Sequence, residues 1–161
     1  LFRSLELLQI ADAVAREKNI EREIVIEATP QEILDVLYDM ETLPDWSSAH
    51  QKVEILTRDE EGRPRRARQV VKIVGVSDEQ ILDYEVHEDG VSWTLVESSQ
   101  QRAQVGRYTL TPDGDNTKVS LELTVDLTAP LPGFLVRKGA AGLMDTATKG
   151  LRKRVLAVKK S

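Results

Sequence analysis

The most regular feature of the chain is an alternation of apolar and polar residues between residues 52 and 128. It is clearest in Lys118–Thr128, where the apolar residues from Val119 to Leu127 alternate with polar ones. A period of two predicts strands with one dry and one wet face. Turn sequences such as Glu88-Asp89-Gly90 separate the segments, so we expect an antiparallel meander. Its predicted strands are Lys52–Thr57, Arg66–Val74, Gln80–His87, Val91–Leu95, Arg102–Thr111 and Lys118–Thr128.

The residues before the meander predict one more strand and two short helices. Ile20–Glu27 alternates in the same way as the later strands. The motif Thr29-Pro30-Gln31-Glu32 follows, with a threonine suited to the N-cap, a proline at the first helical position and a glutamate that completes a capping box. A second short helix is expected near Glu41–Trp46. Helical spacing of apolar residues also predicts a helix over Leu1–Lys18, which we interpret as an N-terminal extension.

After the meander, apolar residues recur at steps of three and four, which predicts a long helix from about Pro132 to Lys160. The stripe consists of Val136, Ala140, Leu143, Met144, Ala147, Leu151, Val155 and Val158. An apolar stripe of this length needs an apolar surface to lie on, and the dry face of the sheet is the surface available. The sequence therefore predicts an α+β domain over residues 19–161, with seven strands and a long C-terminal helix.

This order of elements resembles the START-like superfamily, also called SRPBCC, which includes lipid carriers, plant allergens related to birch pollen and polyketide cyclases. The residues from Ile26 to Asp39, followed by Leu43-Pro44-Asp45-Trp46, are similar to the opening of that family. Gly62–Arg68 and Val91–Leu95 resemble actinobacterial members described as cyclase/dehydrase or lipid transport proteins. The resemblance covers about residues 20–160, and it is specific for fold rather than for chemistry.

The resemblance implies the helix-grip fold, in which a curved seven-stranded antiparallel sheet wraps around the long helix and leaves a cavity. The cavity would be lined by inward residues of the strands, with its mouth near the second helix and the start of the last one. Gln69 is notable because its strand phase points it inward, where a polar amide needs a hydrogen-bond partner. The candidate ligand-binding residues are Trp46, Gln69, Val71, Tyr84, Trp93, Gly106, Tyr108, Phe134, Leu135 and Leu143.

Composition narrows the classes of partner. The net charge is −5, and eight of the 22 basic residues lie from Arg137 onward. The residues before Arg137 carry 14 basic and 26 acidic side chains, which disfavours nucleic-acid binding. The basic residues near the C-terminus, centred on Arg152-Lys153-Arg154, form either a solvated helix face or a surface for transient contact with an anionic membrane. The sequence leaves the oligomeric state open.

Cysteine usage and the N-terminal residues bear on location. The chain has no cysteine, which fits a reducing compartment. Leu1–Arg16 lacks the basic-then-apolar order of a signal peptide, and no stretch is apolar for the length of a membrane span. We therefore expect a cytoplasmic protein.

No catalytic or cofactor motif is present in the sequence. With His50 and His87 as the only histidines and no cysteine, we expect no metal and no cofactor. Three functions stay open. A binding or carrier protein for a lipid-like or polycyclic ligand needs only a dry cavity, and we favour it. A polyketide cyclase or aromatase needs an inward acid or base, and the predicted strands offer only tyrosine and glutamine there, with Arg102 as a further candidate at the edge of its strand. A protein-interaction module would have a closed cavity.

Overall fold

The structure is a computed structural model that describes residues 14–161. The strands are β1 (Val14–Ile26), β2 (His50–Arg58), β3 (Pro64–Ile73), β4 (Val76–His87), β5 (Gly90–Ser98), β6 (Gln101–Asp113) and β7 (Asn116–Pro132). The helices are α2 (Pro30–Tyr38), η1 (Met40–Thr42), α3 (Leu43–Trp46), α4 (Gly133–Asp145), η2 (Thr146–Gly150) and α5 (Leu151–Lys160). The predicted order of one strand, two short helices, six strands and one long helix is confirmed.

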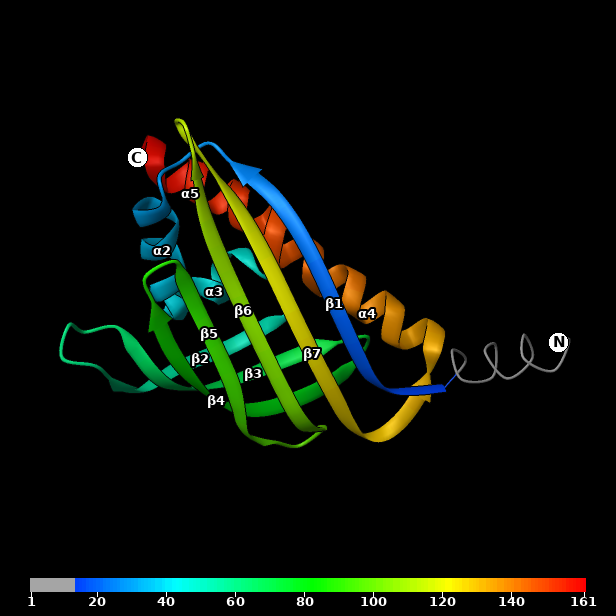
Figure 1. The fold of residues 1–161 in the computed structure, drawn as a ribbon. Coiled ribbons are helices and arrows are strands. Elements are labelled where there is room, and N and C mark those ends of the chain that lie inside the picture. The colour runs from blue at the N-terminus through cyan, green and yellow to red at the C-terminus, as the bar shows by residue number, and fades with distance from the viewer. Residues whose placement is uncertain (1–13) are drawn as a thin grey trace, which may run out of the picture.

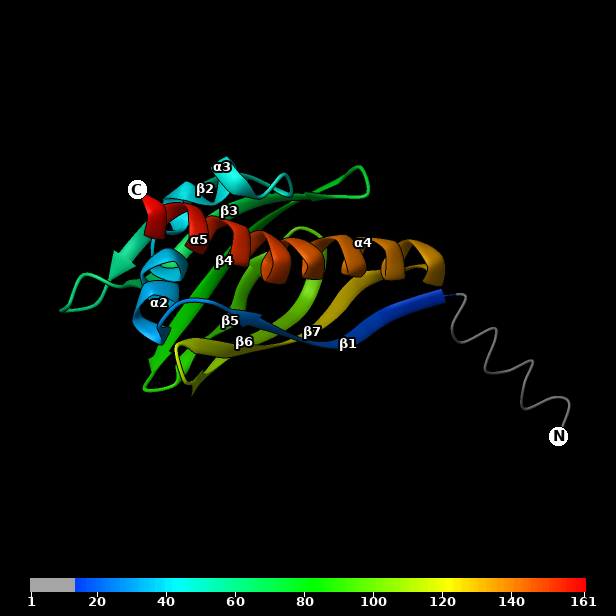
Figure 2. The same ribbon diagram turned by 90° about the horizontal axis from the view of Figure 1, so that it is seen from above.

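The seven strands form one antiparallel sheet in the order β1-β7-β6-β5-β4-β3-β2. Each strand from β2 to β7 pairs with its sequence neighbour. Strand β1 pairs with β7 and forms one edge of the sheet, and β2 forms the other. Figures 1 and 2 show the strands curving around one long helix, which crosses the concave face from α4 to α5. This is the α+β helix-grip arrangement that the sequence predicts.

The helix α2 begins with the capping box that the sequence predicts. The Glu32 backbone N–H donates to Thr29 Oγ1 (3.2 Å), and the Thr29 backbone N–H donates to Glu32 Oε1 (3.0 Å). Two backbone donors that the first turn would leave unpaired are therefore satisfied. The apolar side of α2 is buried through Ile33, Leu34 and Val36. The cap thus fixes where the chain turns from β1 into the helix that covers one end of the sheet.

The C-terminal helix is continuous but not uniform. A π-helical turn at Thr146–Gly150 separates α4 from α5. Such a turn widens the helix and changes its hydrogen-bond pattern. The Tyr108 hydroxyl, rising from β6, donates to the backbone carbonyl of Ala147 (2.8 Å). The widened turn is therefore tied directly to the middle of the sheet.

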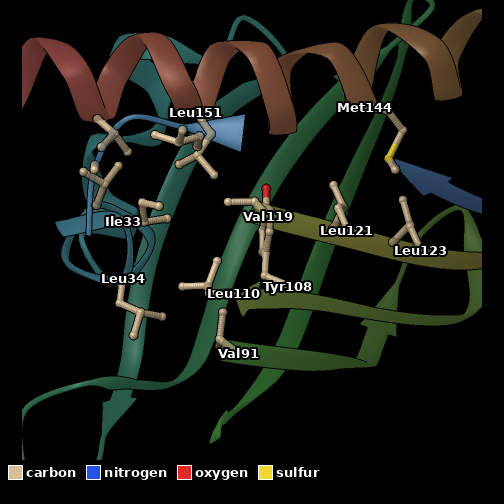
Figure 3. Packing of buried hydrophobic residues seen from close by; sticks show 14 residues of the cluster. Ile33, Leu34, Val91, Tyr108, Leu110, Val119, Leu121, Leu123, Met144 and Leu151 are labelled. Carbon is tan, nitrogen blue, oxygen red and sulfur yellow. The ribbon is translucent and has the colours of Figure 1, made fainter. Parts of the chain in front are cut away.

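The solid core lies under the second half of this helix. Leu151 and Val155 of α5 and Met144 at the end of α4 are almost fully buried against the central strands and α2. Figure 3 shows Leu151 and Met144 pointing from the helix toward the strands, with Tyr108 of β6 directed at the helix. The first half of the helix contributes no other large buried side chain, and this difference positions the site described below.

The expected N-terminal helix is wrong where the structure describes it. Residues 14–18 belong to β1 rather than to a helix, and Val14 and Ala15 pair with Pro132 and Leu131 of β7. The expected boundary between an extension and the domain, at residues 18 and 19, therefore falls inside a strand. Backbone pairing with β7 overrides the helical spacing of the apolar residues in this segment. Residues 1–13 of the expected helix lie outside the described residues.

The capping box yields a first prediction. Changing Thr29 to Ala removes the side-chain acceptor and should lower the free energy of unfolding by about 1 kcal/mol. Thr29→Ser keeps the hydroxyl and should lose much less. Urea denaturation followed by circular dichroism measures both variants, and equal losses would show that the methyl group rather than the hydroxyl matters.

Candidate functional site

A cavity of about 370 Å³ lies between the concave face of the sheet and α4. Strands β3, β4, β6 and β7 supply most of its walls, α4 forms its roof, and α3 borders one side. Most wall residues are apolar, including Val71, Leu82, Leu123 and Leu143. Only Gly133, Gly139 and Met144 are buried along α4, whereas the cavity borders Leu135, Ala140 and Leu143 of the same helix. This is the size and character of a site for a small apolar molecule.

Eight of the ten candidate residues lie on the walls of this one cavity. They are Trp46, Gln69, Val71, Tyr84, Trp93, Tyr108, Leu135 and Leu143. The structure thus brings together residues that are up to 97 positions apart in the sequence. Whether these residues bind a ligand stays a prediction.

Phe134 does not belong to the cavity wall. Its side chain is 62% exposed, whereas its neighbour Leu135 lines the cavity. Successive helical residues point about 100° apart, so two neighbours cannot both face a sheet below them. Leu135, Gly139 and Leu143 follow at steps of four and occupy the inner face of α4. The expectation for Phe134 is therefore corrected.

Gly106 does not line the cavity but packs against Trp93, which does. It pairs with Trp93 across β5 and β6, and a Cβ atom at this position would overlap the indole ring of Trp93. Glycine is needed here because the indole lies flat against the backbone of β6. The missing side chain makes room for Trp93 and not directly for a ligand.

The aromatic residues form one contiguous group. The ring centroids of Trp93 lie 6.3 Å from those of Tyr84 and 5.7 Å from those of Tyr108, with tilted planes. Burial raises the pKa of both tyrosines well above the usual value, so both hydroxyl groups keep their protons. The Tyr84 hydroxyl has no hydrogen-bond partner among residues 14–161.

The other notable part of the wall is a continuous polar strip centred on Asp78, which is 6% exposed. Asp78 Oδ1 accepts from the hydroxyls of Ser98 (2.6 Å) and Ser99 (3.0 Å) and from the backbone N–H groups of Ser99 (3.1 Å) and Gln100 (3.2 Å). Asp78 Oδ2 accepts from the side-chain amides of Gln80 (2.8 Å) and Gln101 (3.0 Å). This number of donors compensates the burial of a charge.

Two arms of amides extend from this carboxylate. In the first arm, Gln69 Nε2 donates to Gln80 Oε1 (3.0 Å), and Gln80 in turn donates to Asp78. In the second arm, Trp93 Nε1 donates to Gln104 Oε1 (2.8 Å), and Gln104 Nε2 donates to Gln101 Oε1 (2.9 Å). The partner that the sequence demands for Gln69 is therefore a glutamine on the neighbouring strand.

The sequence reasoning missed the centre of this strip. It found no inward acid, because the predicted fourth strand began at Gln80, whereas β4 begins at Val76 and includes Asp78. Asp78 and Gln80 share the phase of Leu82 and Tyr84, so extending the period of two by one step would have placed them inside. Gln101 lies at the first residue of β6, where the pattern gives no signal.

His50 lies on the wall close to α3. Its Nδ1 is 2.7 Å from the hydroxyl oxygen of Ser47, and both residues border the cavity. Burial lowers the pKa of His50 to about 4, so the ring is neutral at pH 7. The indole Nε1 of Trp46, from the same segment, is buried without a hydrogen-bond partner among the described residues. Within residues 14–161, no group of three or more His, Asp or Glu side chains could hold a metal ion.

The basic residues near the C-terminus are partly used within the domain. Arg152 donates two hydrogen bonds to Glu27 (2.9 and 2.8 Å), and Lys159 Nζ lies 3.5 Å from a carboxylate oxygen of Glu32. These ion pairs fasten α5 to the β1–α2 corner. Contact of the remaining cations with an anionic membrane stays a prediction. No helix among residues 14–161 is long and apolar enough to cross a membrane.

Comparison with known families gives one match over most of the chain. The family model for polyketide cyclase/dehydrase and lipid transport proteins matches residues 17–156. No curated protein sequence matches the chain.

Several solved structures share the fold. A START superfamily protein from Mycobacterium smegmatis is 26% identical, with 87% of this chain and 98% of that chain covered and a TM-score of 0.79. A protein from Thermus thermophilus is 28% identical, with 88% and 99% covered and a TM-score of 0.73. The Zhui aromatase/cyclase from a Streptomyces species is 14% identical, with 86% and 93% covered and a TM-score of 0.75. This last likeness concerns the fold alone.

The burial of His50 yields a prediction about pH. An unfolded histidine has a pKa near 6.5, so the unfolded chain binds more protons than the folded chain between pH 6.5 and 4. Stability from the neutral ring is present above pH 6.5 and is lost as the pH falls toward 4. Between pH 7 and pH 4, the wild type should lose about 3 kcal/mol more unfolding free energy than a His50→Gln variant. Parallel losses in denaturant titrations at these two pH values would contradict the assignment.

Proposed function

We propose a ligand-binding function for this chain, which belongs to the polyketide cyclase/dehydrase and lipid transport family. The ligand is a small hydrophobic molecule, lipid-like or polycyclic, held between the sheet and α4. The observation that carries the proposal is the cavity of about 370 Å³ with its largely apolar wall. Transfer of an apolar molecule from water into this cavity is favourable by about 25 cal/mol for each Å² of apolar surface that is buried.

The polar groups of the wall favour binding over catalysis. A general base needs a free lone pair within reach of the substrate. Both oxygens of Asp78 already accept several hydrogen bonds. The Tyr108 hydroxyl is engaged by the Ala147 carbonyl, and His50, with a pKa of about 4, is a weak base at neutral pH. These groups are placed to shape and support a wall.

A polyketide cyclase is the second candidate, and Tyr84 is the observation that favours it. Tyr84 borders the cavity, and its protonated hydroxyl has no partner among the described residues, so it could donate to a substrate carbonyl. Polarising a carbonyl in this way is a recognised contribution to catalysis. A cyclase would still need a base, and for this reason we rank it below a binding protein. The open volume of the cavity disfavours a module whose cavity is closed.

Native mass spectrometry of the purified chain, followed by denaturing extraction, tests the proposal directly. A co-purified apolar molecule near equal stoichiometry would support binding and identify its class. A clean mass would be followed by titration with the neutral fluorescent probe N-phenyl-1-naphthylamine. Failure to bind this probe, in a chain with native circular dichroism, would overturn the proposal.

Two neighbouring alanines of α4 allow a matched test of where the ligand lies. Ala140 borders the cavity, whereas Ala141 is exposed on the outer side of the same helix. Ala140→Trp should fill the cavity and weaken probe binding by at least about tenfold, because the ligand loses apolar contact worth more than 1.4 kcal/mol. Ala141→Trp adds the same side chain to the surface and should bind as the wild type does. Equal effects of the two substitutions would place the binding site elsewhere.

A further inference from the structure

We infer that the ligand carries a hydroxyl group on its apolar skeleton, and that this group donates a hydrogen bond to Gln69 Oε1. The inference rests on the proposed binding function and makes it more specific. It follows from the direction in which the hydrogen bonds of the polar strip run.

The two chemical ends of the second arm fix its direction. An indole N–H can only donate, and a carboxylate can only accept. Trp93 therefore donates to the carbonyl oxygen of Gln104, which leaves the amino group of Gln104 for Gln101 and the amino group of Gln101 for Asp78. Every step of this arm is determined, and neither of its ends is open.

The same donor and acceptor reasoning shows that the first arm ends in an acceptor atom without a partner. Gln80 must direct its amino group to the Asp78 carboxylate, so its carbonyl oxygen faces Gln69. Gln69 must then donate with Nε2, and its own carbonyl oxygen is left over. Gln69 Oε1 has no hydrogen-bond partner among residues 14–161.

This oxygen belongs to a side chain that is 5% exposed and lines the cavity. The residue sits in the middle of β3, where the strand pairs with β2 and β4 and the backbone has no freedom to turn the side chain away. Oε1 keeps some exposure, so water can pair with it while the cavity is empty. An apolar ligand that displaces this water would leave the acceptor unpaired at a cost in free energy unless the ligand itself donates to it. The ligand itself is therefore the natural partner.

The chemistry of the partner follows. A hydroxyl can donate to Gln69 Oε1 and can also accept from the second hydrogen on Nε2. An ether or ketone only accepts and would leave Oε1 unpaired, and a carboxylate would place negative charge against an acceptor oxygen near Asp78. The hydroxyl could be phenolic, on a polycyclic skeleton, or alcoholic, on an aliphatic one.

Competition against N-phenyl-1-naphthylamine tests the inference with two pairs of probes. The first pair is 2-naphthol and 2-methoxynaphthalene, and the second is 1-decanol and 1-methoxydecane. In each pair only the hydroxyl can donate, so the wild type should prefer the hydroxyl compound by about tenfold in at least one pair. The pair that shows the preference identifies the phenolic or the aliphatic source.

Two glutamine variants make the test specific. Gln69→Leu should abolish the preference while keeping affinity for the methyl ethers, because the acceptor is lost and the wall stays apolar. The substitution also removes the hydrogen bond to Gln80, so a native circular dichroism spectrum is required of this variant. Gln51→Leu changes an exposed glutamine of β2 outside the cavity and should keep the preference. If the wild type binds the probes but does not distinguish hydroxyl from ether, or if Gln69→Leu keeps the preference, the inference is wrong and ligand binding stands. If the wild type binds none of the probes, the proposed function fails, and the inference fails with it.

Discussion

The architecture depends on how one long helix is held over the sheet. Its second half, α5, is packed tightly: Leu151 and Val155 are almost fully buried, Arg152 pairs with Glu27 just after β1, and Lys159 pairs with Glu32 of α2. Its first half, α4, covers the cavity and buries only Gly133, Gly139 and Met144. A helix is stiff over this length, so fastening one half holds the other half above the strands without filling the gap. The cavity is thus a consequence of unequal packing along a single element.

An apolar cavity of this kind still contains a buried charge, and the surrounding residues show how it is accommodated. Asp78 is surrounded by hydroxyls, backbone N–H groups and amides from the β5–β6 turn and β4. Removing a carboxylate from water is costly unless such donors replace its hydration. The charge in turn orders the amides around it, because each must direct its amino group toward Asp78. Electrostatics at one residue thereby decides which atom is presented to the cavity several residues away.

Much of the fold could be predicted from the sequence because its main signals are periodic. The alternation of apolar and polar residues located all six strands of the meander, and the capping box located α2. Strand ends were less predictable: Asp78 was missed because β4 begins at Val76, four residues before the start of the predicted strand. Pairing with β7 is a long-range interaction, and the local pattern of residues 14–18 does not reveal it.

The candidate site was predictable to the extent that strand phase fixes the direction of a side chain. Phase placed Gln69, Tyr84 and Trp93 on the wall correctly. It could not show that Gly106 serves the ring of Trp93, because this depends on a contact across two strands. Nor could it show which glutamine donates to which, since the direction of the amide chain follows from three-dimensional contacts with Asp78 and Trp93.

The π-helical turn at Thr146–Gly150 affects which way the apolar residues of the long helix point. Four of these residues are spaced by four positions: Leu143, Ala147, Leu151 and Val155. In a regular α-helix each step of four overshoots a full rotation by about 40°, so such a stripe drifts around the helix. The wider π-helical turn rotates less for each residue and takes up part of this drift. The π-helical turn therefore keeps the apolar residues on one side of the helix, so that this side faces the cavity along α4 and the solid core along α5.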